Sequence, residues 1–267
     1  MNFTKDDKLA LLGLSIIVFG LMIVAGTYFG IAGLIFVQTF AIIFIVAVFL
    51  SSSRKIRKQI SKSQRDTESY FALYSTVKFD KPLPPLGGHA MTPFGAKNLT
   101  SLVLAEKPNT VVEYGSGVST LIVAYCLKQL GSGKIISYDH ESLYAGKSQD
   151  LIDEHEINEY AEVVYAPLVE KEISGERWLW YDVSKRELPV TIDLLIVDGP
   201  PRKIQKRSRY PALNSIQSRL KPGSLIVLDD SDRVEEQEII KAWQNQLPNL
   251  QVIPSLSMFG VTVFRVS

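Results

Sequence analysis

An α/β domain with a mostly parallel sheet, preceded by two long apolar helices, is the fold that the sequence predicts. Three observations carry this prediction: unbroken apolar segments near the N-terminus, strand-like and helix-like segments that alternate from residue 93 onward, and acidic residues that end several strands. Such alternation is typical of a sheet with helices on both faces. The 267 residues are enough for one substantial domain and an appendage.

The N-terminal appendage is apolar, and residues 9–50 contain no charged residue. Two segments within it, residues 9–28 and 31–50, are each long enough as helices to cross a hydrocarbon core of about 30 Å. Gly26, Gly30 and Gly33 lie where the chain would reverse. We therefore expect residues 1–53 to form a membrane anchor, a transmembrane hairpin. A secretory signal peptide fits less well because its apolar core has about 7–15 residues, and a buried pair of soluble helices is the other alternative.

A basic segment follows the second apolar stretch. It has no acid before Asp66, and its cations are Arg54, Lys55, Arg57, Lys58, Lys62 and Arg65. Positive residues flank membrane spans on the cytoplasmic side, so a multi-pass protein of the cell membrane is predicted, with its N-terminus and its large domain in the cytoplasm. The same cations could attract anionic headgroups.

The charge of the remaining chain argues against nucleic acid as a partner. The whole chain has a net charge of +1, but 21 basic and 26 acidic residues from Asp66 onward give that part −5. A mildly acidic domain is a poor candidate for general nucleic-acid binding. The single Cys126 cannot form an internal disulfide, which suits a reducing compartment.

Residues 54–92 are predicted to connect the anchor to the domain. From Asp66 this connector is too rich in breakers for long regular structure, with Pro82, Pro84, Pro85, Gly87 and Gly88. The domain itself is expected to cover residues 93–267. Helices are predicted over residues 93–106, 120–130, 143–155, 212–220 and 234–247. Strands are predicted over residues 110–114, 134–139, 161–166, 192–198, 224–229, 250–253 and 260–266.

A looser stretch is expected between the third and fourth strands. It contains Trp178, Trp180 and Tyr181. These aromatic side chains could cover a substrate or the membrane-facing side of the domain, and core packing is the alternative.

The segment T-V-V-E-Y-G-S-G-V-S-T, residues 110–120, carries the best evidence of chemistry. Its apolar run predicts a buried strand, and Gly115 and Gly117 allow positive φ and close approach of the backbone to a ligand. A strand, a Gly-x-Gly turn and a helix present backbone N–H groups to a nucleotide-like ligand. The pair of glycines alone is equally typical of a tight turn.

Acidic residues at the ends of four strands strengthen this interpretation. They are Glu113, Asp139, Asp198 and the pair Asp229–Asp230. Ligands of open α/β sheets bind outside the carboxyl ends of the strands. One such acid is often a helix cap, but four strand ends together indicate a ligand site.

Four motifs, in this order and spacing, resemble the class I S-adenosylmethionine (SAM)-dependent methyltransferases: V-V-E-Y-G-S-G-V-S-T, I-I-S-Y-D-H-E, D-L-L-I-V-D-G-P-P and L-K-P-G-S-L-I-V-L-D-D. The resemblance covers roughly residues 82–267 and is greatest to the small-molecule O-methyltransferase branch. It implies a Rossmann-like sheet and SAM as cofactor. A dinucleotide-binding domain would have a third glycine near position 120, where this chain has Thr120.

The resemblance implies cofactor contacts at the ends of three strands. Asp139 would accept hydrogen bonds from the ribose hydroxyls, because its two oxygens can meet two vicinal donors. Ala166 and Pro167 would lie near adenine. The amino acid and sulfonium portions would meet Glu113, Gly115, Ser116 and Gly117.

Asp198 would lie beside the transferable methyl group and is a candidate catalytic residue. Catechol-type methyltransferases hold a divalent ion with two Asp and one Asn, and the corresponding residues here look like Asp198, Asp229 and Asp230. Three oxygen ligands could hold Mg²⁺, which can depress the pKa of a substrate hydroxyl. Asp in place of Asn adds negative charge, so metal dependence stays open.

Two histidines and one basic loop are the other candidates. His89 or His140 could act as general base, and a loop or packing role is the alternative for each. The loop after Asp198 is basic, and an anionic lipid or glycan acceptor could bind there through Arg202, Lys203 and Arg209. A solvated loop explains these charges equally well.

The sequence thus predicts a membrane-anchored, SAM-dependent methyltransferase that O-methylates a small or membrane-associated, lipid-linked acceptor. A catalytically silent scaffold in a membrane complex is the alternative from another class. A nucleotide-sugar or dinucleotide enzyme on the same fold class is the third.

Overall fold

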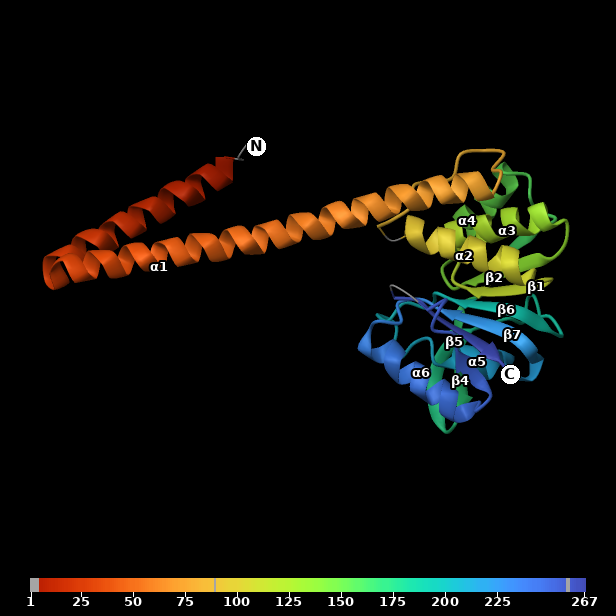
Figure 1. Cartoon of the computed structure of the whole chain (residues 1–267). Coiled ribbons are helices and arrows are strands. Elements are labelled where there is room, and N and C mark those ends of the chain that lie inside the picture. The colour runs from red at the N-terminus through yellow and green to blue at the C-terminus, as the bar shows by residue number, and fades with distance from the viewer. Residues whose placement is uncertain (1–4, 89, 258–259) are drawn as a thin grey trace. The chain divides into compact units, whose positions relative to one another are not determined.

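The computed structural model describes residues 5–88, 90–257 and 260–267 (Figure 1), with the backbone alone for residues 5–12, 14 and 15. The chain divides into two compact units, Met1–Gln64 and Arg65–Ser267.

The first unit is formed by most of helix α1 (Lys5–Thr76), which is interrupted at Gly30. Gly30 has φ 61° and ψ −148°, which is not helical, and Figure 1 shows the chain turning back there. The two arms touch beside the turn, because a Cβ at Gly33 would lie 2.6 Å from the carbonyl oxygen of Ala25. The two predicted helices are therefore present as one helical element with a single break.

Apolar side chains of this element are exposed, as at Ile31 (77%) and Phe36 (73%). By length and composition alone, the part from Ile16 onward is apolar and long enough to cross a membrane, and none of its most apolar window is buried. Among the described residues, one helix meets these two criteria, so the two separate spans that we expected are not seen.

Helix α1 continues to Thr76, through residues that we expected to be an irregular connector. Ser69, Leu73 and Val77 recur every four residues and are each at most 2% exposed, in the core of the second unit. This spacing places them on one face of a helix. The prediction was wrong here because the breakers begin only at Pro82, after the helix has ended.

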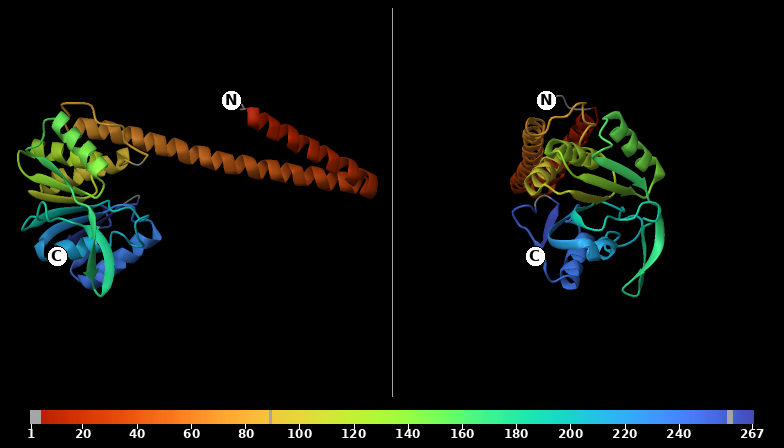
Figure 2. Two further views of the ribbon diagram at one scale, coloured as in Figure 1. Left: turned by 180° about the vertical axis from the view of Figure 1, so that it is seen from behind. Right: turned by 90° about the vertical axis from the view of Figure 1, so that its right-hand side faces the viewer.

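The second unit contains a seven-stranded sheet in the order β3-β2-β1-β6-β7-β9-β8 (Figure 2). All neighbours are parallel except that β9 runs antiparallel to β7 and β8. The strands are β1 (Thr110–Tyr114), β2 (Lys134–Asp139), β3 (Ala161–Tyr165), β6 (Ile192–Val197), β7 (Leu220–Leu228), β8 (Leu250–Val252) and β9 (Thr262–Val266). The helices are α2 (Pro93–Glu106), α3 (Val118–Leu130), α4 (Ser142–Glu154), α5 (Pro211–Ile216), a 3₁₀ turn (Gln217–Arg219) and α6 (Val234–Gln246).

Helices cover both faces of this sheet, which confirms the predicted α/β fold. Alternate residues of β1 face opposite layers, with Val111 packed among α2, α3 and α4 and Val112 among α5 and α6. Both side chains are fully buried. This explains why the strand reads as a continuous apolar run, since a central parallel strand is covered on both sides.

A two-stranded hairpin replaces the looser stretch that we expected after β3. It consists of β4 (Leu168–Ile173) and β5 (Glu176–Tyr181), joined by Ser174 and Gly175 with φ 53° and 79°. Two left-handed residues in a two-residue loop are typical of a type I′ hairpin. Trp180 and Tyr181 are fully buried and Trp178 is 5% exposed, so these aromatic residues pack in the core.

Cys126 lies within α3 and is fully buried. Burial raises the pKa of its thiol to about 12. Because the thiolate is the reactive species, this thiol is inert in the folded domain.

Candidate active site

The loop between β1 and α3 passes very close to the end of β6. Gly115 has φ 99°, and a Cβ there would lie 3.2 Å from the backbone nitrogen of Gly199. Only glycine fits this conformation and this approach. On the other side, the Gly115 N–H donates to the carbonyl of Tyr138 at 2.9 Å, so the loop is fixed between β2 and β6.

Glu113 stabilises the start of α3 through hydrogen bonds to its carboxyl group. Its side chain is fully buried, and its oxygens accept hydrogen bonds from Ser119 and Thr120, each at 2.5 Å, and from Ser137. Burial raises the pKa of the carboxyl group, which these three hydroxyls oppose. The carboxyl group is thus engaged within the protein, and a direct contact with the cofactor stays a prediction.

Asp139, at the end of β2, closes the other side of the loop. Its Oδ2 accepts from the Ser116 N–H at 3.0 Å and the Ser116 hydroxyl at 2.7 Å, and its Oδ1 accepts from the Glu141 N–H at 3.0 Å. The end of β3 lies alongside, because the Ala166 N–H donates to the Asp139 carbonyl at 2.8 Å. The structure therefore brings together the residues predicted for the ribose and, with Ala166 and the adjoining Pro167, for adenine.

The acids at the ends of β6 and β7 also converge. Asp198, Asp229 and Asp230 each have a carboxylate oxygen within 4.8 Å of the others. The Asp198 side chain is 41% exposed, and it lines a cavity. Partial removal from bulk water in this cavity, and then repulsion from Asp229, raise the pKa of its carboxyl group well above the usual range. Burial and the neighbouring Asp230 likewise raise the pKa of Asp229.

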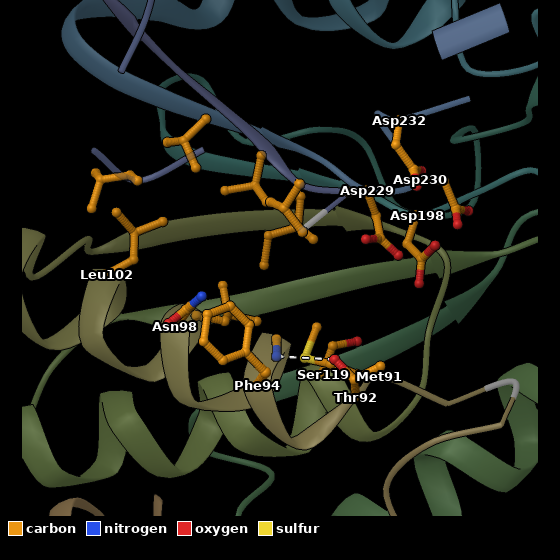
Figure 3. Close-up of a pocket in the computed structure, with 18 of the residues that line it drawn as sticks. Met91, Thr92, Phe94, Asn98, Leu102, Ser119, Asp198, Asp229, Asp230 and Asp232 are labelled. Carbon is orange, nitrogen blue, oxygen red and sulfur yellow. Dashed lines mark hydrogen bonds between the residues drawn. The ribbon is translucent and has the colours of Figure 1, made fainter. Parts of the chain in front are cut away.

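A cavity of about 460 Å³ opens beside these acids (Figure 3). Asp198, Asp229, Asp230 and Asp232 lie together on one side, and side chains of α2 lie across from them. The α2 side is mostly apolar and includes Phe94, Leu99 and Leu102, with Asn98 and Ser101 as polar exceptions. Ser119, near the start of α3, also lines the cavity. The cavity therefore adjoins the glycine loop and the strand-end acids at once.

The basic loop after Asp198 does not act as one surface. Arg202 and Lys203 are exposed, and neither is among the described residues that line the cavity. Lys203 has its ammonium 3.9 Å from Glu141, whereas Arg209 is only 3% exposed and points into the acid cluster. An anionic acceptor that binds all three together has no support in this arrangement.

The two histidines differ in what can be said of them. His140 lies beside the loop, with its Nδ1 3.7 Å from Asp139 Oδ1, and lines no part of the described cavity. His89 lies outside the described residues. A catalytic role for either remains a prediction.

Sequence reasoning missed three contributors. Arg209 was predicted only as a contact for an anionic acceptor and not as a partner of the acid cluster, and α2 was not expected to form a wall of the cavity. The third is the hydroxyl of Tyr181, which occupies the space where a Cβ of Gly199 would lie, so this turn requires glycine. The sequence did indicate the helix itself, because Thr92 precedes Pro93 as a helix cap; in the structure the Thr92 hydroxyl accepts from the Gly95 N–H at 3.1 Å.

Comparison with known proteins matches one part of the chain to a protein family. Residues 112–231 match a protein family described as a methyltransferase domain. A sequence search of curated proteins found no match.

Two solved structures share the fold. One is the S-adenosylhomocysteine (SAH)-bound methyltransferase PaMTH1 of Podospora anserina, with a TM-score of 0.54 and 14% identity over 80% of this chain and 96% of that chain. The other is an O-methyltransferase of Bacillus cereus in complex with SAH, with a TM-score of 0.50 and 16% identity over 76% of this chain and 90% of that chain. Residues 112–231 thus match a methyltransferase domain, and the chain shares its fold with these two methyltransferases.

Proposed function

We propose that this protein is a SAM-dependent methyltransferase that O-methylates a small, largely apolar acceptor carrying a hydroxyl group, and that it works at a membrane. The proposal rests mainly on one observation: Ser119, at the start of α3 after the glycine loop, and Asp198, directly after β6, line the same cavity. The acceptor would therefore bind where the loop and the strand-end acids meet.

The cofactor would be held by the ends of β1 and β2. A Cβ at Gly117 would have no atom within 4 Å, so there is room above the loop for a ligand. A carboxylate has about four acceptor positions, and Asp139 uses three of them. The Ser116 hydroxyl also lies 2.9 Å from the Ser148 hydroxyl, so it can leave Asp139 and free the carboxylate for two ribose hydroxyls.

The acceptor would lie in the cavity between α2 and the acids. When bound, SAM supplies an electrophilic methyl group, so transfer to oxygen releases the proton of the acceptor hydroxyl. Asp198 is the proposed proton acceptor because it faces the cavity and lies directly after β6. The apolar residues of the α2 wall, and four aspartates against the one cation Arg233 among the described lining residues, favour a neutral or cationic acceptor over an anionic one.

Asp139→Asn in the full chain, in detergent, is expected to weaken SAM binding about 10- to 100-fold, because it removes the charge that strengthens hydrogen bonds from the ribose. Isothermal titration calorimetry would measure this. Asp150→Asn, an exposed acid of α4, is the matched control and should bind SAM as the wild type does. Equal affinity of Asp139→Asn and wild type would contradict the assignment, and wild-type binding of NAD without SAM would overturn the proposed function.

Membrane insertion of α1 is proposed from its exposed apolar side chains. A soluble protein rarely exposes a contiguous apolar patch of more than a few hundred Å². The break at Gly30 divides the apolar part into two arms, each of about the length that crosses a bilayer. The cations from Arg54 onward support a cytoplasmic position for the proposed methyltransferase domain, because positive residues flank membrane spans on that side.

Two single-cysteine variants test this orientation. Tyr28→Cys lies beside the turn, and Ser52→Cys lies before the basic segment; both positions are exposed. In intact cells we expect a membrane-impermeant maleimide to label only the Tyr28→Cys variant, and the Ser52→Cys variant after permeabilisation. The wild type is the control, because its buried Cys126 should stay unlabelled. Recovery of the chain in the soluble fraction, or labelling of both variants from outside, would contradict insertion as a hairpin.

A further inference from the structure

Arg209 is a buried cation in the middle of the acid cluster. Its side chain is 4% exposed. Its Nη2 donates to Asp198 Oδ1 and to Asp230 Oδ2, both at 3.0 Å, and so connects the carboxylates that follow β6 and β7.

The backbone of both strand ends fixes the same guanidinium. Arg209 Nη1 donates to the carbonyl of Asp229 at 2.7 Å, and Nη2 donates to the carbonyl of Asp198 at 2.7 Å. Moving the side chain out of the cluster would therefore break four hydrogen bonds. Nη2 shares its two hydrogens among three of these acceptors, and the planar fork of a guanidinium reaches them together with Nη1, which a lysine ammonium cannot do in the same geometry.

A second arginine adds to the charge compensation. Arg233 Nη2 lies 2.6 Å from Asp230 Oδ1, so both oxygens of Asp230 are paired with guanidinium groups. Asp230 has a left-handed backbone with φ 55°, which is uncommon for a residue other than glycine and places its carboxylate between the two arginines. The three carboxylates thus have two resident cations beside them.

This arrangement does not fit a divalent metal. Mg²⁺ requires near-octahedral oxygen ligands at about 2.0–2.1 Å. At the centre of the cluster it would compete with Arg209 for oxygens of Asp198 and Asp230, while the fixed positive charge repels it. The chemistry of the donor set therefore disagrees with the metal site that the resemblance implied.

We propose that Arg209 takes the place of a metal ion: it is the permanent cation that orients Asp198 toward the acceptor, and the reaction needs no divalent metal. This inference rests on the proposed function for its catalytic part. Its metal-binding part stands on the arginine contacts alone. Arg209 is a positioning residue, because it acts on the acceptor through Asp198.

The test begins with Mn²⁺ titration of the wild-type full chain in detergent, followed by electron paramagnetic resonance, with Mg²⁺ as competitor. We expect no saturable binding at micromolar Mn²⁺. Arg209→Met removes the cation and keeps the length of the side chain, and we expect it to gain Mn²⁺ affinity at least about tenfold as the carboxylates become available. A purely structural role of Arg209 would not create such a site. Arg177→Met, an exposed arginine of β5, is the matched control and should bind no more Mn²⁺ than the wild type.

Activity supplies the second measurement. Methyl transfer by the wild type should persist in a strong chelator, and Arg209→Lys should lower kcat at least about tenfold, since the ammonium cannot hold both carboxylates, with KM for SAM nearly unchanged. Tight Mn²⁺ binding by the wild type, displaced by Mg²⁺, or reversible loss of activity in chelator would overturn the proposal. If Arg209→Met does not fold, the wild-type titration and Arg209→Lys still decide. Absence of SAM binding would instead refute the proposed function, and the Mn²⁺ result would remain a separate test of the site.

Discussion

Asp198→Asn is expected to lower kcat about 10²- to 10⁴-fold, the range that general base catalysis contributes. The amide keeps the size of the side chain and an oxygen for Arg209, but it cannot take up the proton that the acceptor loses. Affinity for SAM should change little, because the cofactor contacts are proposed at Gly117, Ser116 and Asp139. Single-turnover transfer of labelled methyl groups to an extract or defined acceptor would measure the rate, and calorimetry the affinity.

The matched control is Asp193→Asn, on the same strand but at its other end. Asp193 accepts from the backbone N–H groups of Asn109 and Thr110, each at 2.9 Å, and pairs with Lys221 at 2.6 Å. Its replacement should lower stability while leaving the rate per folded molecule unchanged. If Asp198→Asn transferred methyl groups as fast as this control, Asp198 would not be the proton acceptor.

Glu113→Ala should lower the free energy of unfolding by at least about 3 kcal/mol, because three buried hydroxyls lose their common acceptor at about 1–3 kcal/mol each and a void is left. The start of α3 and the glycine loop would loosen with it, so SAM affinity should fall as well. Glu113→Gln keeps an oxygen acceptor and the volume, and we expect it to lose less of both. Urea unfolding and calorimetry in the same detergent would measure the two effects.

Val112→Ala distinguishes a general loss of stability from a loss of the glycine-loop conformation. Val112 is the preceding residue and is equally buried, but it packs toward α5 and α6. It should destabilise the domain by a cavity and leave SAM affinity intact. Should Glu113→Ala instead unfold like the wild type and yet fail to bind SAM, the carboxyl group would contact the cofactor directly, as the sequence resemblance implies.

The elements around the loop could be predicted because their signals are local. The strand over residues 110–114 is a short apolar run bounded by Pro108 and Gly115, and the strand over residues 134–139 ends in the acid that meets Ser116. In a parallel sheet such ends must meet at one edge, so sequence order alone predicts that Asp139 and Asp198 lie near the same loop.

What could not be predicted depends on contacts between distant residues. Which cation of the loop 202–209 turns inward is decided by the carbonyl groups of two strand ends, and the sequence shows only five cations among eight residues. The hairpin β4–β5 differs, because the Ser174–Gly175 pair is typical of a two-residue hairpin turn. We did not predict it because charged residues flank the turn. Helix α1 beyond residue 66 was missed because we expected the breakers from Pro82 onward to interrupt the whole segment, and the core into which Leu73 and Val77 pack is formed by later segments.

The rate at which the single buried thiol is modified can report the stability of the domain. Because Cys126 lies in the middle of α3 with no exposure, it can react with a thiol reagent only when that helix opens. The rate of its modification, followed by mass in unfractionated cell extracts, would therefore measure the opening free energy of the core without purification of the protein. The effect of SAM on that rate would report ligand binding in the same extracts, because a ligand that binds only the folded state slows opening.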